Sequence, residues 1–415
     1  MNILIVSQYF WPESVRINEM VKALRATGAA VTVLTGQPNY PDGAIFPGYS
    51  AMSTGLEEDT HGTPVYRVPL IPRGRASRFR LAANYASFAI SATVFGAWLL
   101  RGRQVDVIFV YAPSPLLQAL PGMFLKRLKK APLVTWVQDL WPESLVATGS
   151  VTNESLLQMV KKLVVWIYRD SDLVLAQSRS FVKSITELAG NTPVEYFPNP
   201  GEDAFRTAEP RPGPALILQP AFNVVFTGNL GSVQALDTLV RAAELLRSHT
   251  DVRFVIIGSG SRAGWLAHEV AAKGLDNVSL PGRFPPDAMP GIMAQASALL
   301  VSLIRSPIMS QTIPSKVQAY LAAGKPIVAA LDGEGAAVVL EAGAGLACPA
   351  EDPRALAELV LRLKAMSEAE RRRMGQAGQR YYAGHFDAAV LARRLVDRLE
   401  HLRATAVTPS LSAAT

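Results

Sequence analysis

The sequence contains a single cysteine, Cys348, among 415 residues. One cysteine excludes a disulfide framework and a cysteine-built metal site, and it favours a reducing compartment. We expect Cys348 to be a small buried hydrophobic side chain. The five histidines show no spacing typical of metal ligands, so a zinc site has little support.

Charged residues are also scarce, at 18% of the chain, whereas hydrophobic residues reach 49%. This composition excludes extended disorder and supplies enough core for two or three domains. The net charge of +7 favours an anionic partner, such as a nucleotide, a phospholipid surface or a nucleic acid. The first residues lack a basic region, and Gln8, Pro12 and Glu13 interrupt their apolar run, so we expect a buried strand there and no signal peptide.

Residues 81–100 contain no charged side chain and are long enough to reach across a bilayer. The alternatives are a buried crossover helix, a helix lying in the membrane interface and a true span. Asn84, Ser87 and Ser91 form a narrow polar stripe, and arginines flank both ends, which argues against spanning. The basic flanks comprise Arg73, Arg75, Arg78, Arg80, Arg101 and Arg103, and a later helix adds Lys126, Arg127, Lys129 and Lys130.

Apolar runs alternate with helical patterns along nearly the whole chain, which predicts an α/β fold with parallel sheets. A segment rich in proline and glycine divides this series into two Rossmann-like, doubly wound domains, which we expect to face a central cleft. The predicted parts are an N-terminal domain at residues 1–200, a linker at 201–221, a second domain at 222–385, a terminal helix at 386–403 and a disordered tail at 404–415.

Residues 310–327 have the pattern of a loop, a helix and a turn into a strand. Pro314 suits a first helical turn, Ser315 is a candidate cap, and Gly324 ends the predicted helix. The loop would aim free backbone N–H groups and Lys316 at a ligand, an arrangement suited to phosphate. An ordinary connection in a parallel sheet is the alternative.

Two further patterns are weak. Asp170 and Asp172 have the spacing of a metal-diphosphate motif, but they directly precede a predicted strand. The glycine loop of residues 258–264 resembles a dinucleotide fingerprint, but its spacing differs and it lies in the second half of the chain.

The stronger signals are loops at the carboxyl ends of strands, where open α/β sheets bind ligands. These loops comprise residues 12–16 and 138–144 in the first domain, and 228–231, 282–284 and 310–316 in the second. Loops in both domains imply a two-part substrate, with one part held by each. Asp139 lies at such a strand end, where a carboxylate can accept or orient a hydroxyl proton. Its alternative role is to cap the following turn.

Several motifs occur in a characteristic order along the chain. They are M-N-I-L-I-V-S-Q-Y-F-W-P-E, Q-D-L-W-P-E-S, Y-F-P-N-P, F-T-G-N-L-G, I-I-G-S-G, N-V-S-L-P-G-R and P-S-K-V-Q-A-Y-L-A-A-G-K-P-I. In this order and spacing the chain resembles the retaining glycosyltransferases of family 4, with the GT-B fold and C-terminal helices that pack back on the first domain. Within the family it is similar to the bacterial branch that builds colanic acid, O-antigen and capsule, which includes N-acetylfucosamine transferases.

The resemblance implies a nucleotide-sugar donor in the second domain and an acceptor in the first. Residues implied at the donor are Gly228, Asn229, Gly231 and Gln234 near the diphosphate, Arg283 and Phe284 near the base, and Ser310, Thr312, Ile313 and Pro314 in the later loop. Those implied at the acceptor are Glu13, Ser14 and Arg16, and those implied in the reaction are Asp139, Glu143, Gln311 and Lys316. Members of this kind usually need no metal and no further cofactor.

The chain departs from the family pattern at two places. Many members carry Glu-x7-Glu where this chain has Gln311 and Ala319, and Ala319 cannot hold a ribose. Many also carry Arg and Lys where this chain has Asn229 and Gln234, so two cations are missing from the implied diphosphate site. Our hypothesis is that Lys316, Arg305 or Arg16 substitutes, because positive charge should oppose a departing diphosphate.

Residues and resemblance together predict a retaining glycosyltransferase that moves an N-acetylhexosamine from a UDP-sugar. The expected acceptor is a polyprenyl-diphosphate-linked glycan of bacterial surface polysaccharide, used at the cytoplasmic face of the plasma membrane by a peripheral enzyme that binds no nucleic acid. Two alternatives stay open at this point. One is a GT-B nucleotide-sugar epimerase, and the other is a non-catalytic sugar-nucleotide-binding partner of an assembly complex.

Overall fold

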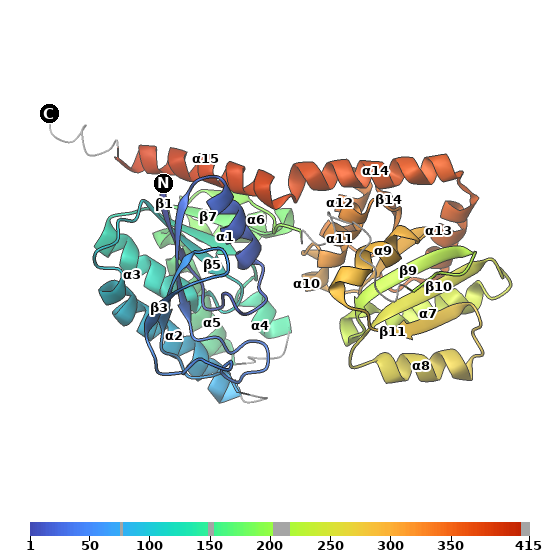
Figure 1. The fold of residues 1–415 in the computed structure, drawn as a ribbon, viewed down its shortest axis with the longest axis horizontal. Coiled ribbons are helices and arrows are strands. Elements are labelled where there is room, and N and C mark those ends of the chain that lie inside the picture. Colours follow the sequence, from blue (N-terminus) through green and yellow to red (C-terminus); the bar gives the residue numbers. More distant parts are fainter. Residues whose placement is uncertain (75–77, 148–152, 202–215, 408–415) are drawn as a thin grey trace. The chain divides into compact units, whose positions relative to one another are not determined.

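A computed structural model describes residues 1–74, 78–147, 153–201 and 216–407 (Figure 1). The described residues divide into two compact units, Met1–Pro200 with Ala388–Thr415, and Gly201–Asp387. Most of the linker predicted at 201–221, and residues 408–415 of the predicted tail, lie outside the described residues.

The first unit is organised around a sheet whose strands are β1 (Asn2–Val6), β2 (Ala30–Gly36), β3 (Gly55–Glu58), β4 (Pro64–Val68), β5 (Val107–Ala112), β6 (Leu133–Val137), β7 (Leu173–Ala176) and β8 (Val194–Tyr196). Among the described residues these strands have the order β3-β4-β2-β1-β5-β6-β7-β8. Neighbours pair in parallel except for β3, which runs antiparallel to β4 at the edge. Sequence patterning missed β3 because G-L-E-E has no apolar alternation to mark a half-buried strand.

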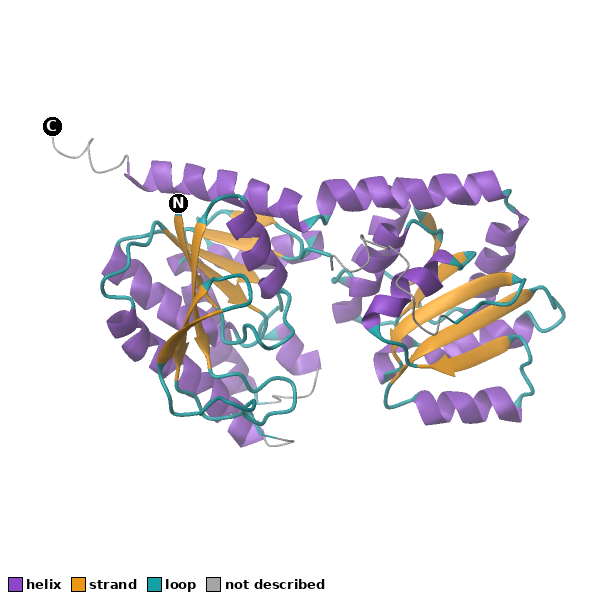
Figure 2. Ribbon diagram, viewed as in Figure 1, coloured by secondary structure: helices purple, strands orange, loops and turns teal. Residues whose placement is uncertain are grey.

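Helices cover both faces of this sheet (Figure 2). They are α1 (Ile17–Ala26), α2 (Arg78–Leu99), α3 (Ala119–Lys129), α4 (Glu143–Ala147), α5 (Glu154–Asp170), α6 (Arg179–Ala189) and α15 (Ala388–Val407). One apolar layer joins the sheet to α2, α3, α5 and α6, and a second joins it to α1 and α15. The predicted doubly wound arrangement is confirmed.

The uncharged segment 81–100 forms α2, which connects β4 to β5 and packs on the sheet through Phe88 and Ala92. The crossover position is therefore confirmed. Among the residues that the structure describes, no helix is long and apolar enough to cross a membrane.

The second unit contains the strands β9 (Phe222–Asn229), β10 (Val252–Ser259), β11 (Val278–Gly282), β12 (Ala298–Ser302), β13 (Ile327–Ala330) and β14 (Gly345–Cys348). Within its described part they form a parallel sheet in the order β11-β10-β9-β12-β13-β14. The helices are α7 (Leu236–Leu245), α8 (Ala263–Ala272), α9 (Met289–Ala294), α10 (Pro307–Ser310), α11 (Ser315–Ala323), α12 (Glu334–Glu341), α13 (Pro353–Ala365) and α14 (Glu368–His385). Cys348 is buried in this unit's core, as predicted.

The last two helices belong to different units. Helix α14 packs on α11 in the second unit, whereas α15 returns to the first unit and packs on α1 (Figure 1). Arg398 of α15 forms a bidentate ion pair with Glu195, whose shortest N–O distance is 2.7 Å. Helix α15 continues to Val407, so the tail predicted to begin at residue 404 is helical over its first four residues. Its sequence R-A-T-A-V contains no glycine or proline to end the helix earlier.

Candidate active site

The strand order of the second unit fixes where a ligand is expected. The chain runs outward from β9 to β10 and β11, then crosses back to place β12 on the other side of β9. The carboxyl ends of β9 and β12 therefore meet at the point where the strand order reverses, which is the ligand position in open α/β sheets. The loop after β9 and the segment from β12 to α11 lie there.

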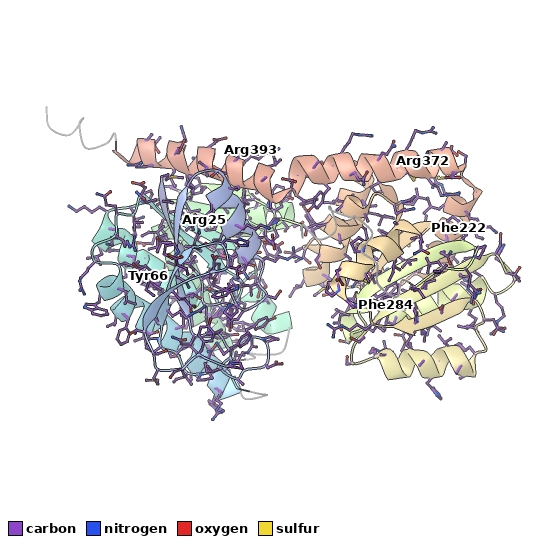
Figure 3. All side chains as sticks on the ribbon, viewed as in Figure 1. Arg25, Tyr66, Phe222, Phe284, Arg372 and Arg393 are labelled. Carbon is purple, nitrogen blue, oxygen red and sulfur yellow. The ribbon has the colours of Figure 1, made fainter. Side chains whose placement is uncertain are left out.

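A cavity of about 420 Å³ opens at this edge of the sheet. It is lined by the ends of the adjacent strands β9 and β10 and by the segment after β11 that carries Arg283 and Phe284. Phe284 is labelled on that segment in Figure 3. The lining residues are Thr227, Gly228, Asn229, Ile257, Gly258, Ser259, Arg283, Phe284, Pro286 and Met289. The structure thus brings together four donor residues implied by the family resemblance, Gly228, Asn229, Arg283 and Phe284.

Two glycines at the cavity have a structural reason to be glycine. Gly228 and Gly258 are paired in register at the ends of β9 and β10, with φ angles of +114° and +150°. A Cβ atom on Gly258 would lie 1.8 Å from the carbonyl oxygen of Gly228. The two backbones therefore approach as closely as only glycine permits, and neither residue places a side chain of its own at the cavity.

Replacing Gly258 with alanine is expected to destabilise the second unit by about 2–4 kcal/mol, because the new methyl group meets a backbone carbonyl and the φ angle is strained. Urea unfolding followed by circular dichroism measures the change. Gly264→Ala is the matched control, since Gly264 lies in α8 and its added Cβ meets no atom within 4 Å beyond its chain neighbours and its own helix backbone. Equal stability of Gly258→Ala and the native chain would contradict this account.

Lys316 lies in the first turn of α11, and its side chain reaches Gly228 at the end of β9. Its Nζ donates a hydrogen bond of 2.5 Å to Oε1 of Gln234 and lies 4.7 Å from the centre of the Phe226 ring. Its Cε would be 3.2 Å from a Cβ on Gly228. Burial lowers the pKa of Lys316 to about 8, because desolvation disfavours the charged ammonium.

The groups around Lys316 are held by hydrogen bonds from neighbouring elements. Ser302, at the end of β12, donates to the backbone carbonyl of Gln234 at 2.7 Å. The Tyr320 hydroxyl, one turn after Lys316 on α11, accepts the backbone N–H of Thr227 at 3.0 Å. Sequence reasoning missed Tyr320, although its four-residue spacing from Lys316 places both side chains on one helical face.

The segment before α11 differs from its prediction. Residues 307–310 form the short helix α10, and Gln311 follows as its C-cap. Pro314, in an extended conformation, occupies the N-cap position of α11 and Ser315 is the first helical residue, so the prediction of Ser315 as the cap was wrong. Proline fixes its own φ and offers no side-chain acceptor, which leaves the first turn without a side-chain cap.

The other implied residues of this segment have local contacts. Ser310 donates to the carbonyl of Pro307 at 2.9 Å, and Thr312 donates to that of Met309 at 3.3 Å. Ile313 and Ala319 pack against the apolar core. Gly231 lies against the Asn229 side chain, so the loop after β9 is compact.

The three cations suggested as substitutes differ in what they contact. The Arg305 backbone N–H donates to Glu351, and its guanidinium donates to the carbonyl of Ala350 at 3.0 Å and lies 3.5 Å from the Asp332 carboxylate. Arg16 belongs to the first unit and donates to the carbonyl of Pro200 at 2.9 Å. Of these three cations, Lys316 is the one that lies beside Gly228 of the cavity.

In the first unit, Glu13 holds two loops together. Its carboxylate accepts the backbone N–H groups of Phe10, Asn39 and Tyr40 at 3.1, 2.7 and 2.7 Å, and the residue is 1% exposed. Burial raises the pKa of Glu13 to about 7, against the lowering effect of these hydrogen bonds. These contacts indicate that the buried Glu13 positions the loop that carries the exposed Ser14. The family resemblance implied both residues at the acceptor.

Asp139 and Glu143 follow β6 as predicted, in different environments. Glu143 begins α4 and is exposed. Asp139 is half-buried, and burial raises its pKa, while hydrogen bonds from Ser144, Ser114 and Trp141 act to lower it. These bonds fix the turn after Asp139 and favour the capping alternative, and its role toward an acceptor hydroxyl stays a proposal.

No group of three or more His, Cys, Asp or Glu side chains that could hold a metal ion occurs among the described residues. The weak metal-diphosphate pattern has a structural explanation. Asp170 accepts hydrogen bonds from Arg127, and Asp172 accepts the backbone N–H of Leu133 at 2.7 Å and pairs with Lys126 at 2.8 Å. Asp170, at the end of α5, therefore contacts α3. Asp172, just before β7, contacts the start of β6 and α3.

Two family models match the chain. The glycosyl transferase 4-like domain matches residues 14–200, and the model for glycosyl transferases group 1 matches residues 221–365. Among curated relatives, the chain is 28% identical over 346 residues to WcaI of Escherichia coli (strain K12), named as a colanic acid biosynthesis glycosyl transferase. That match covers 78% of this chain and 82% of WcaI. WbjE of Pseudomonas aeruginosa, named as a glycosyltransferase, is 26% identical, with 69% of this chain and 73% of WbjE covered.

Among solved structures, HepE of Anabaena in complex with UDP superposes with a TM-score of 0.68 at 15% identity, over 97% of this chain and all of HepE. This likeness confirms the predicted GT-B fold. The chain therefore combines a glycosyl transferase 4-like domain with a domain of the group 1 glycosyl transferases on the GT-B fold, and we place it among the glycosyltransferases.

Proposed function

We propose that this chain is a retaining glycosyltransferase that moves an N-acetylhexosamine from a UDP-sugar to a polyprenyl-diphosphate-linked glycan in bacterial surface polysaccharide synthesis. The observation that carries the proposal is the cavity at the ends of β9 and β10 and the segment after β11, with Lys316 beside Gly228. The names of the relatives support the polysaccharide context, and the UDP complex of HepE supports a uridine donor.

The donor's parts match the chemistry of the cavity. Phe284 offers an aromatic face and Arg283 a cation and hydrogen-bond donors, which suit a nucleobase and its attached groups. The bare backbone at Gly228 and Gly258 admits a diphosphate, and Lys316 supplies the positive charge that Asn229 and Gln234 lack. Gln311 and the loop of Ser310, Thr312, Ile313 and Pro314 are proposed to contact the sugar.

The reaction breaks the bond between the anomeric carbon and the diphosphate oxygen, and the oxygen of an acceptor hydroxyl bonds to that carbon on the same face. The hydroxyl proton passes to the departing diphosphate oxygen. Negative charge grows on the leaving diphosphate, where the Lys316 ammonium and the N-terminal amides of α11 stabilise it. The acceptor is proposed to contact the first unit near Ser14, Arg16 and Glu143. Asp139 is proposed to orient the acceptor hydroxyl, and Glu13 to position these loops.

UDP and UDP-N-acetylhexosamines are expected to raise the melting temperature of the second unit, because a ligand that binds the folded state stabilises it. Phe284→Ala should reduce this shift at equal ligand concentration, since the base loses its aromatic contact. Leu245→Ala, at a half-exposed position on α7, is the control. Thermal-shift measurements that show no stabilisation by any UDP-sugar would exclude this donor.

Turnover separates the proposed transferase from the alternatives. Incubation with UDP-N-acetylhexosamine and a polyprenyl-diphosphate-linked acceptor should yield an elongated glycan whose new bond keeps the donor's anomeric configuration, as read by NMR. Conversion of the nucleotide sugar without acceptor would identify an epimerase. Donor binding without any turnover would identify a non-catalytic binding partner.

A further inference from the structure

The outward face of α2 is apolar from Ala82 to Trp98. Exposed residues recur every four positions at Ala82, Ala86, Ile90, Val94 and Trp98, and the last three are 66%, 61% and 57% exposed. No charged residue occurs between residues 81 and 100. A helix that faces water normally carries charged or polar side chains on this face.

The polar side chains of α2 face the protein instead. Asn84 donates to the carbonyl of Ile71 at 2.7 Å, and Ser87 accepts the backbone N–H of that residue at 2.9 Å. Ser91 donates to the carbonyl of Pro69 at 2.5 Å. The predicted polar stripe of Asn84, Ser87 and Ser91 therefore forms hydrogen bonds with residues 69–71, which precede α2. The apolar side of the helix faces outward.

Neighbouring helices extend this surface. Helices α3 and α5 cover the same side of the sheet as α2, and their exposed residues include Phe124 and Leu128 on α3 and Trp166 on α5. We call Ile90, Val94, Trp98, Phe124, Leu128 and Trp166 the apolar face. A group of large exposed apolar side chains on adjacent helices marks an interaction surface.

Some nearby cations hold the helices together. Lys129 of α3 donates to the carbonyls of Leu100 and Arg103 at 2.5 and 2.9 Å, and Lys126 donates to that of Asp170 at 2.7 Å. Arg127 pairs with the Asp170 side chain. Lys126, Arg127 and Lys129 of the basic patch predicted at the end of α3 thus link the ends of α2, α3 and α5. Lys130, its fourth member, has no such contact among the described residues.

Other cations border the apolar face. The Arg101 guanidinium lies 4.9 Å from the centre of the Trp98 ring, and Lys161 and Lys162 are exposed on α5. Tryptophan beside arginine or lysine at the edge of an apolar surface is typical of side chains at the bilayer interface. A second copy of this chain would bring the same positive charge against this border, whereas anionic lipid headgroups complement it.

We propose that the apolar face docks this chain on an anionic lipid bilayer, with Ile90, Val94 and Trp98 inserted among the headgroups. Phe88 and Ala92, on the opposite side of α2, are buried against the sheet, so the helix lies along the interface. The purpose of docking rests on the proposed function, since a polyprenyl-linked acceptor is held in the membrane. The binding itself depends only on the first unit's surface.

Flotation with vesicles tests the docking. The full chain is expected to float with phosphatidylglycerol–phosphatidylcholine vesicles, and much less with phosphatidylcholine alone or at high salt. The double variant Ile90→Glu/Val94→Glu should bind the anionic vesicles at least tenfold more weakly. Leu340→Glu is the matched control, because Leu340 is 56% exposed on α12 in the second unit, and it should float like the native chain.

Several results would overturn the proposal. They are a native chain that does not float, a double variant that floats equally well, and a native dimer in light scattering that the double variant converts to a monomer. The last would identify a second copy as the occupant. Native-like tryptophan fluorescence of the double variant shows that its first unit is folded, and stabilisation by UDP shows that donor binding is intact. Docking without UDP binding would refute the donor proposal alone, and UDP binding without docking would refute this inference alone.

Discussion

Lys316→Ala is expected to lower kcat for sugar transfer by at least about 100-fold, with UDP affinity changed only a few-fold. Removing a group that stabilises charge developing in a transition state typically costs about 2.7–4 kcal/mol. Lys316 lies beside Gly228 of the cavity, and its ammonium group donates a hydrogen bond to Gln234. Steady-state kinetics with saturating donor measures kcat, and thermal shift measures UDP binding.

The pH dependence of this reaction follows from the same side chain. Because burial lowers the pKa of Lys316 to about 8, the free enzyme loses this charge as pH rises through 8. We expect kcat/KM to fall above pH 8. Lys316→Arg should retain part of the activity without that falling limb, because a guanidinium stays charged.

Stability has the opposite dependence in this pH range. The unfolded chain keeps the lysine protonated up to its ordinary pKa of 10.5, so between pH 8 and 10.5 it binds more protons than the folded chain. The free energy of unfolding should therefore rise with pH in that window as far as Lys316 determines it. Loss of activity above pH 8 thus cannot be attributed to unfolding caused by this residue.

Lys325→Ala is the matched control for Lys316→Ala. Lys325 follows the other end of α11, beyond Gly324, and burial also lowers its pKa. Lys316 lies within 4 Å of the Cβ position of Gly228 and Lys325 does not, so we expect kcat of Lys325→Ala within about threefold of the native value. A Lys316→Ala variant with near-native kcat would remove Lys316 from the mechanism and return the search to the α11 amides and Gln311.

Much of the fold could be predicted because the sequence patterns that specify its helices and strands are local. The strands of both sheets are short apolar runs bounded by turn residues, and glycine after α11 adopts the left-handed conformation that ends a helix, with φ of +68° at Gly324. The uncharged segment gave a helix of nearly the predicted extent. Edge strand β3 has no such local signal, because it is specified by its pairing with β4.

The candidate site could be predicted only in part, because tertiary structure determines which groups each side chain contacts. The sequence pointed to Lys316, but its desolvation depends on Phe226 and Gln234, which lie on distant parts of the chain. The requirement for glycine at position 258 arises from its pairing with Gly228, so the loop alone looked like a weak motif. The family resemblance implied Glu13 at the acceptor, and nothing in the local sequence reveals that its carboxylate accepts three backbone N–H groups.

Glu13→Ala is expected to lower the free energy of unfolding of the first unit by about 3 kcal/mol or more. The change leaves the backbone N–H groups of Phe10, Asn39 and Tyr40 without their acceptor, and each buried unsatisfied donor costs about 1–3 kcal/mol. Urea unfolding followed by tryptophan fluorescence is suited to the measurement. Five of the six tryptophans, all except Trp265, lie in the first unit.

The pH profile of stability distinguishes the charge of Glu13 from its packing. The folded pKa is about 7 and the ordinary value is 4.5, so between these values the folded chain binds more protons than the unfolded one. The contribution of Glu13 to stability should therefore be greatest at pH 4.5 and below, and should fall as the pH rises from 4.5 to 7, by about 1.4 kcal/mol per pH unit. Glu13→Gln cannot ionise, so its profile should be flatter by about 3 kcal/mol between pH 5 and 8. Glu19→Gln on α1 should keep the native slope, and parallel profiles for Glu13→Gln and the native chain would show that Glu13 is ionised throughout.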